Sequence, residues 1–88
     1  MSYVLNLSAA VEQQILSHPE PLRQFILLSL ERLAQRPTSF RSRTSVRGQL
    51  AEFKFDRAGI SLWLTVTFFY GQDEQTLHIE EIAIEFGE

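Results

Sequence analysis

The chain contains no cysteine among its 88 residues. This absence excludes disulfide bonds, thiolate nucleophiles and metal sites built on sulfur. The two histidines, His18 and His78, lie far apart in the sequence, so we expect neither a metal site nor another cofactor. There is also no apolar run of about 20 residues and no basic stretch before an apolar one at the amino terminus. We therefore expect no membrane span, no signal peptide and a cytoplasmic protein.

Lysine and arginine are scarce outside one segment. Six of the eight Lys and Arg residues lie between positions 36 and 57, a stretch that we call the basic segment, whereas residues 73–88 hold six acids and no Lys or Arg. Guanidinium groups bind phosphate oxygens bidentately, so this segment predicts a nucleic-acid contact. The predicted contact residues are Arg41, Arg43, Arg47, Lys54 and Arg57. Because the whole chain carries a net charge of −3, a solvated polar linker is the alternative interpretation.

The period of the apolar residues predicts one α+β domain over residues 1–88. A short strand at 3–7 precedes a helix from about 9 to 17 with Ser8 as its N-cap, and a second helix ends near Arg36, before Pro37. After a polar connection at 37–48, strands at 51–56, 60–70 and 77–86 follow. The expected fold is a small antiparallel sheet with two N-terminal helices packed on one side, in the order β-α-α-β-β-β. The predicted core residues are Leu22, Phe25, Ile26, Leu30, Leu33, Phe53, Phe55, Leu64 and Val66.

The last predicted strand changes its apolar face. Leu77 and Ile79 are apolar at odd positions, whereas residues 82, 84 and 86 are apolar at even positions. A β-bulge at Glu80-Glu81 would keep both sets on the core. In the strand at 60–70, Trp63 and Tyr70 could stack on bases, but a central strand favours core positions for both.

Two short stretches carry a resemblance to a known family. Residues 30–37 (LERLAQRP) form a helix end with two leucines and a closing proline, and residues 48–54 (GQLAEFK) form a strand that begins with glycine. Together with the order and lengths of the elements, they resemble the bacterial RelE/ParE toxin superfamily, with Lys54 in the position of the family's arginine. The resemblance implies the toxin half of a toxin–antitoxin pair. It also implies an antitoxin packed along the sheet and helices, and a target that is ribosome-bound mRNA or DNA gyrase.

The resemblance leaves the chemistry open. The family usually carries an arginine early in the central strand, where this chain has residues 60–65 (ISLWLT), and the last strand here is acidic and apolar. Candidates for catalysis of metal-free RNA cleavage are Lys54, Glu52 and His78, with Glu52 and His78 as proton-transfer groups. The cation could come from Lys54 or from the loop arginines at 41, 43 and 47. A solvated Glu52–Lys54 ion pair and a solvent-facing or partner-facing His78 are the plainer interpretations. We expect slow or absent cleavage; RelE-like endoribonuclease activity and a non-catalytic protein-interaction module remain the alternatives. A second copy of the chain is an alternative partner to an antitoxin.

Overall fold

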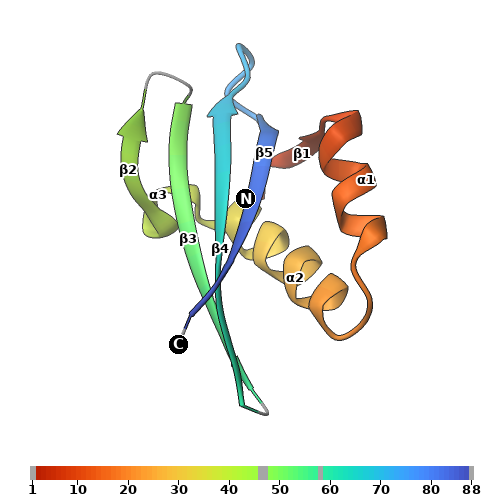
Figure 1. Ribbon diagram of the computed structural model, residues 1–88. Helices are drawn as coiled ribbons and strands as arrows, with labels where there is room; N and C mark the ends of the chain where they lie inside the picture. Colours follow the sequence, from red (N-terminus) through yellow and green to blue (C-terminus); the bar gives the residue numbers. More distant parts are fainter. Residues whose placement is uncertain (1, 46–47, 58, 88) are drawn as a thin grey trace.

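A five-stranded sheet with helices on one side forms the architecture (Figure 1). The computed structural model describes residues 2–45, 48–57 and 59–87, and for residues 41–45 it describes the backbone alone. The elements are β1 (Val4–Leu7), α1 (Ala9–Ser17), α2 (Leu22–Gln35), α3 (Pro37–Phe40), β2 (Arg41–Ser45), β3 (Gly48–Arg57), β4 (Ile60–Tyr70) and β5 (Thr76–Phe86). The strand order is β1-β5-β4-β3-β2. The predicted α+β class, with two long helices ahead of the three main strands, is confirmed.

Both long helices begin and end where local chemistry predicts. The backbone N–H of Val11 donates to the Ser8 hydroxyl oxygen at 3.2 Å, which satisfies one of the free donors at the start of α1. Helix α2 ends at Gln35, and the Arg36 N–H still donates to the Arg32 carbonyl at 3.1 Å. Pro37 cannot continue the helix because it lacks a donor. Within the described ranges, no helix is long and apolar enough to cross a membrane.

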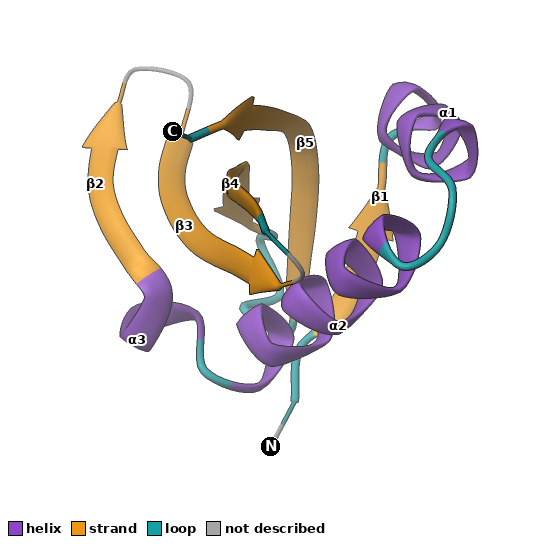
Figure 2. Ribbon diagram, turned by 60° about the horizontal axis from the view of Figure 1, so that its bottom comes forward, coloured by secondary structure: helices purple, strands orange, loops and turns teal. Residues whose placement is uncertain are grey.

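The core lies between the helices and one face of the sheet (Figure 2). Six of the predicted core residues are buried: Ile26, Leu30, Leu33, Phe53, Leu64 and Val66. The other three, Leu22, Phe25 and Phe55, are half-buried at its margin. The rings of Phe25 and Phe55 lie 5.0 Å apart and close the core where α2 meets β3.

The bulge predicted in the last strand is present. Thr67 pairs with Glu81 and Phe68 pairs with Ile79, so Glu80 is the extra residue of β5. Leu77, Ile79 and Ile82 are buried in the same core because the bulge corrects the alternation between them.

Two expectations about the sheet were wrong. The sheet is mixed rather than purely antiparallel, because β1 runs parallel to β5 at the edge, with Val4 opposite Thr76 and Leu7 opposite Ile79. The polar connection at 37–48 contains the short helix α3 and the edge strand β2, which pairs with the start of β3. An edge strand needs only backbone pairing, so its Ser, Thr and Arg residues show no apolar alternation that could have predicted it.

The tryptophan expected in the core lies outside it. Trp63 is 41% exposed on the sheet face opposite the helices, which we call the helix-free face. Its neighbours Leu62 and Leu64 are buried on the helix side, as strand alternation requires. Tyr70, in contrast, is half-buried and packs against the core.

Candidate functional site

The helix-free face of the sheet mixes acids and aromatic rings. By register and alternation its described side chains come from four strands, with Asn6 of β1 beside His78 at one edge and the charged and aromatic side chains on the other three. They are Glu52, Lys54 and Asp56 on β3, Trp63, Thr65, Thr67 and Phe69 on β4, and His78, Glu81, Ala83 and Glu85 on β5. Among these side chains Lys54 is the single Lys or Arg. Its Nζ lies 4.0 Å from the Asp56 carboxylate and 5.9 Å from the centre of the Trp63 ring. On the other side of β4, Trp63 pairs with Glu85 of β5.

The three catalytic candidates do not form one centre. Glu52 and Lys54 share the helix-free face of β3, and the ion pair of Lys54 is with Asp56. Glu52 pairs with Thr65 of β4, whereas His78 pairs with Phe69, four residues farther along that strand. With about 3.3 Å per residue and about 4.8 Å between strands, His78 is roughly 16 Å from Glu52. A proton cannot pass directly between groups this far apart.

His78 is held by its neighbours. The side-chain amide nitrogen of Asn6 lies at hydrogen-bond distance, 2.9 Å, from Nδ1 of His78. The ring stacks on Phe69, with 5.0 Å between centres and 19° between planes. These contacts join β1, β5 and β4, so His78 has a structural role at this end of the sheet.

The described members of the predicted nucleic-acid-binding set are spread along β2 and β3, with Lys54 between the two ends of β3. The backbones of Arg41 and Arg43 lie in β2, opposite Ala51 and Leu50, while Arg47 lies outside the described residues. Arg57 is exposed at the other end of β3, about 23 Å from the Arg43 position at about 3.3 Å per residue. The basic segment is therefore spread along β3 rather than gathered at one point.

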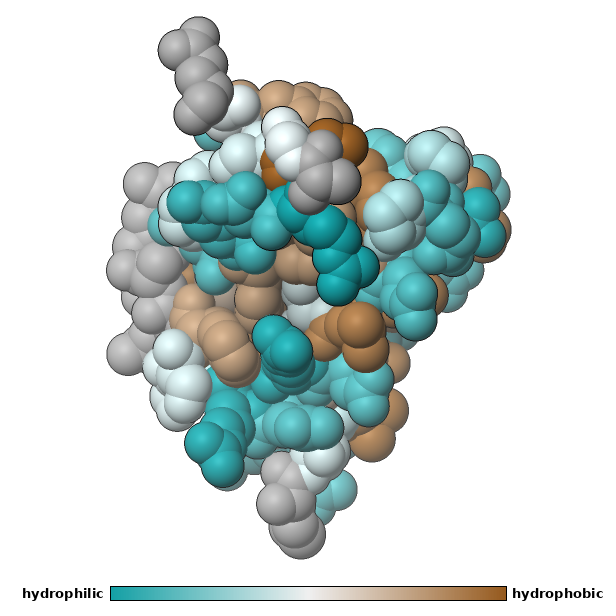
Figure 3. All heavy atoms as spheres, turned by 90° about the horizontal axis from the view of Figure 1, so that it is seen from below, coloured by the Kyte–Doolittle hydropathy of each residue, from teal (hydrophilic) through white to brown (hydrophobic). Residues whose placement is uncertain are grey.

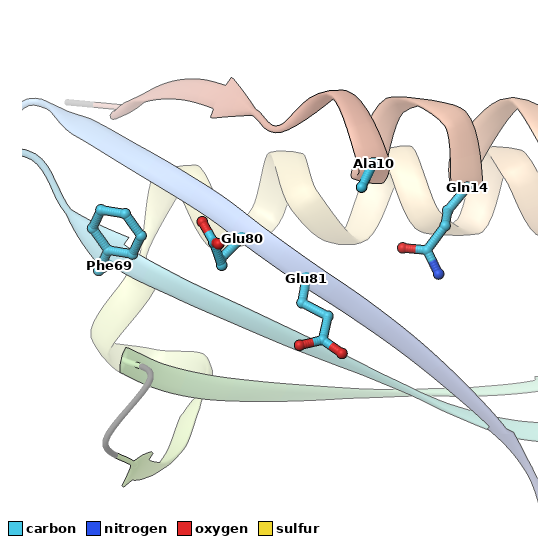
Figure 4. Close-up of a pocket in the computed structure, with 5 residues that line it drawn as sticks. All are labelled: Ala10, Gln14, Phe69, Glu80 and Glu81. Carbon is cyan, nitrogen blue, oxygen red and sulfur yellow. The ribbon is translucent and has the colours of Figure 1, made fainter.

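An acidic cleft lies between α1 and the β5 bulge (Figure 4). It is lined by Ala10 and Gln14 of α1, Phe69 of β4, and Glu80 and Glu81 of β5. The Gln14 amide donates to the Ile82 carbonyl at 3.3 Å and ties the helix to the strand beyond the bulge. Two adjacent carboxylates make this cleft unsuitable for phosphate.

Asp73 organises the turn between β4 and β5. Its carboxylate accepts the backbone N–H groups of Gln75 at 3.0 Å and Thr76 at 3.2 Å, and the Thr76 hydroxyl at 3.1 Å. These hydrogen bonds, that from Gln75 foremost, lower the pKa of Asp73 from its usual 3.8. The carboxylate is committed to the turn, which makes it a structural group rather than a proton donor.

A groove that sequence reasoning missed lies between α2 and β3. This α2–β3 groove is lined by Pro21, Gln24, Phe25, Leu28 and Arg32 on the helix side and by Lys54, Phe55, Asp56 and Arg57 on the strand side. Seen from below, the surface shows apolar side chains between hydrophilic ones (Figure 3). One sequence signal could have indicated an apolar surface here. Leu27 and Leu28 are apolar but lie outside the predicted core stripe of the helix, and they are 46% and 49% exposed.

Comparison with solved structures identifies the fold. The chain is similar to a double arginine-to-alanine variant of the E. coli toxin RelE in the free state, with a TM-score of 0.66 and 10% identity over 94% of this chain and 83% of that chain. No protein-family model matches the chain, and no curated protein matches its sequence. The chain therefore has the RelE-like toxin fold, and the fold implied by the sequence resemblance is confirmed.

Proposed function

We propose that this chain is the toxin-like component of a toxin–antitoxin module and binds RNA or the translation machinery through its basic segment. The observation that carries the proposal is the RelE-like fold over 94% of the chain. The position of β2 adds support, because this strand brings Arg41 and Arg43 beside β3 at an edge of the sheet. Arginines on an edge strand, together with the exposed rings of Trp63 and Phe69 on the same sheet, suit a single-stranded nucleic acid.

Binding without efficient cleavage is the action the geometry supports best. Metal-free cleavage needs a base, a cation and an acid around one phosphate. Lys54 is engaged by Asp56 at 4.0 Å, and the Nδ1 of His78 lies at hydrogen-bond distance, 2.9 Å, from the side-chain amide nitrogen of Asn6. The roughly 16 Å between His78 and Glu52 separates the two candidate proton-transfer groups.

Salt-dependent binding of a labelled single-stranded RNA tests this proposal. Measured at about 50 mM and about 200 mM salt, affinity for the wild type should fall with a slope that reflects about three released counterions. Arg43→Ala should reduce that slope by about one. Arg32→Ala removes the same charge from helix α2, outside the basic segment, and should leave the slope unchanged. Equal slopes for the three proteins, or affinity independent of salt, would refute RNA binding by the basic segment.

The second candidate function is a non-catalytic protein-interaction module. The acids of the helix-free face favour it, because Glu52, Asp56, Glu81 and Glu85 repel a polyanion in a chain of net charge −3. This candidate predicts no RNA binding at either salt concentration and no growth arrest on expression, with an intact fold.

A further inference from the structure

The strand ends at one end of the sheet carry apolar side chains that are open to water. There β3 and β4 run on beyond both long helices (Figure 1). Phe55, Leu62 and Phe86 pair side by side across β3, β4 and β5, so their side chains share the helix side of the sheet. Leu62 is buried, whereas Phe86 is 71% exposed, the highest value among the large apolar side chains that the structure describes. Ile60, two residues before Leu62 and on the same side, is 48% exposed. The core is therefore partly open at this end.

An apolar crevice lies where the strands run on past the helices. One wall is the chain from Pro19 to Leu22, which joins α1 to the start of α2, and the other wall consists of the strand ends with Phe55, Ile60, Leu62 and Phe86. The volume of the crevice is about 220 Å³. A cavity of about 150 Å³ lined by similar side chains holds a benzene molecule, so the crevice has room for a large apolar side chain.

One charge of each sign borders the exposed apolar side chains. Glu20 belongs to the helix-side wall of the crevice, and Arg57 lies at the end of β3, where it pairs with Ile60 and shares its side of the sheet. Both are exposed, and neither forms an ion pair within the part of the chain that the structure describes. An apolar centre with charged side chains around it is the usual anatomy of a protein–protein interface.

We propose that two copies of the chain associate through this end, about a two-fold axis. A two-fold contact uses the same patch on both copies, so the patch must be complementary to itself. This patch has projecting apolar strand ends beside an apolar crevice, and a cation beside an anion. Ile60 and Phe86 of each copy fill the crevice of the other, and Arg57 of each copy meets Glu20 of the other.

The charges favour a second copy over nucleic acid at this end. Arg57 and Glu20 neutralise each other, and an apolar crevice without net positive charge has no attraction for phosphate. The contact also leaves the edge strand β2 free, because the Arg43 position lies about 23 Å along β3 from Arg57. The inference thus goes beyond the proposed function and assigns Arg57 to the contact between copies.

Analytical ultracentrifugation of the full chain, from about 1 μM to about 1 mM, tests the apolar contact. The wild type should form a dimer whose fraction rises with concentration. Phe86→Asp should raise the dimer Kd about tenfold or more, because it places a charge in the crevice of the other copy. Leu16→Asp is the matched control, since Leu16 is 66% exposed on α1 and does not line the crevice; its Kd should stay within about twofold of the wild type. A wild type that is monomeric throughout, or equal losses in both variants, would overturn the proposal.

Exchanging the two charges tests the geometry. Arg57→Glu and Glu20→Arg should each raise the dimer Kd about fivefold or more, because each brings like charges together twice in the dimer. The chain with both substitutions should return to within about twofold of the wild type, since the pair is restored with its signs reversed. Arg36→Glu changes an exposed charge outside the crevice and should have little effect. Absence of recovery in the double variant would overturn the contact between Arg57 and Glu20.

The lack of cysteine in the chain allows a direct test of which faces meet. Mixed under mild oxidation, chains with Arg57→Cys and chains with Glu20→Cys should form a disulfide-linked heterodimer. Chains with Arg57→Cys mixed with chains with Arg36→Cys should do so about tenfold more slowly. Equal rates in the two mixtures would assign any dimer to another face and overturn the proposal. Salt-dependent RNA binding through Arg43 is measured separately, so failure of the dimer and failure of the proposed function remain distinct results.

Discussion

Replacing Phe68 and Phe69 separately by alanine compares the two faces of the central strand with one type of side chain. Phe68 is fully buried on the helix side, while Phe69 is 41% exposed on the helix-free face and stacks on His78 at 5.0 Å. Phe68→Ala should cost about 3–5 kcal/mol, because it removes a buried ring and leaves a closed cavity. Phe69→Ala should cost roughly half as much, because part of the ring is already in water and its loss leaves no closed cavity.

Equilibrium urea denaturation, followed by circular dichroism, measures both free energies of unfolding. A chain of this length has a total stability of about 4–13 kcal/mol, so Phe68→Ala is tolerated only if the wild type lies in the upper part of that range. Phe68→Leu, expected to cost about 1–2 kcal/mol, keeps the comparison measurable if the alanine variant does not fold. Equal costs for Phe68→Ala and Phe69→Ala, or a larger cost at Phe69, would refute the assignment of the faces.

Three further predictions concern the backbone and one turn. Asp73→Asn should destabilise the protein at neutral pH, where the native carboxylate accepts the Gln75 and Thr76 N–H groups. Because the pKa of Asp73 is lowered in the native state, the difference in unfolding free energy between variant and wild type should shrink as pH falls below 3.8. A difference independent of pH would contradict this role. Deleting Glu80 should abolish cooperative thermal unfolding, because it removes the bulge that keeps Leu77 and Ile82 on one face, whereas Glu80→Ala should unfold cooperatively. Gly48→Ala should cost about 1–3 kcal/mol in urea denaturation, because φ is +133° and an added Cβ would lie 2.7 Å from the Phe68 carbonyl oxygen. Gly59 also has a positive φ, +79°, but a Cβ added there meets no atom within 4 Å beyond its chain neighbours, so an equal cost for Gly59→Ala would contradict a contribution from the contact with Phe68.

The helices, the three main strands and the bulge were predictable because local sequence determines them. Ser8 and Pro37 mark helix ends through hydrogen-bonding capacity alone. The change of face between Ile79 and Ile82 follows from the two-residue period of a strand and a single buried face. These signals need no information about distant residues.

The parts that were missed depend on tertiary position. Nothing in residues 4–7 specifies a parallel neighbour, since that pairing depends on where α1 and α2 return the chain. Trp63 has a large aromatic side chain of the kind often found in a core. The sheet face on which it lies is fixed by its pairing with Lys54 of β3 and Glu85 of β5. The α2–β3 groove lies beside the part of β3 that β2 does not pair with, and no local pattern shows that β2 begins only at the position opposite Ala51.

Growth of bacteria after induced expression tests the central claim most directly. The account predicts that the wild-type chain arrests growth, and that a variant with Arg41, Arg43 and Arg47 all replaced by alanine accumulates to the same level, folds and permits growth. Equal growth of cells that express either folded protein would contradict a toxin-like action through the basic segment.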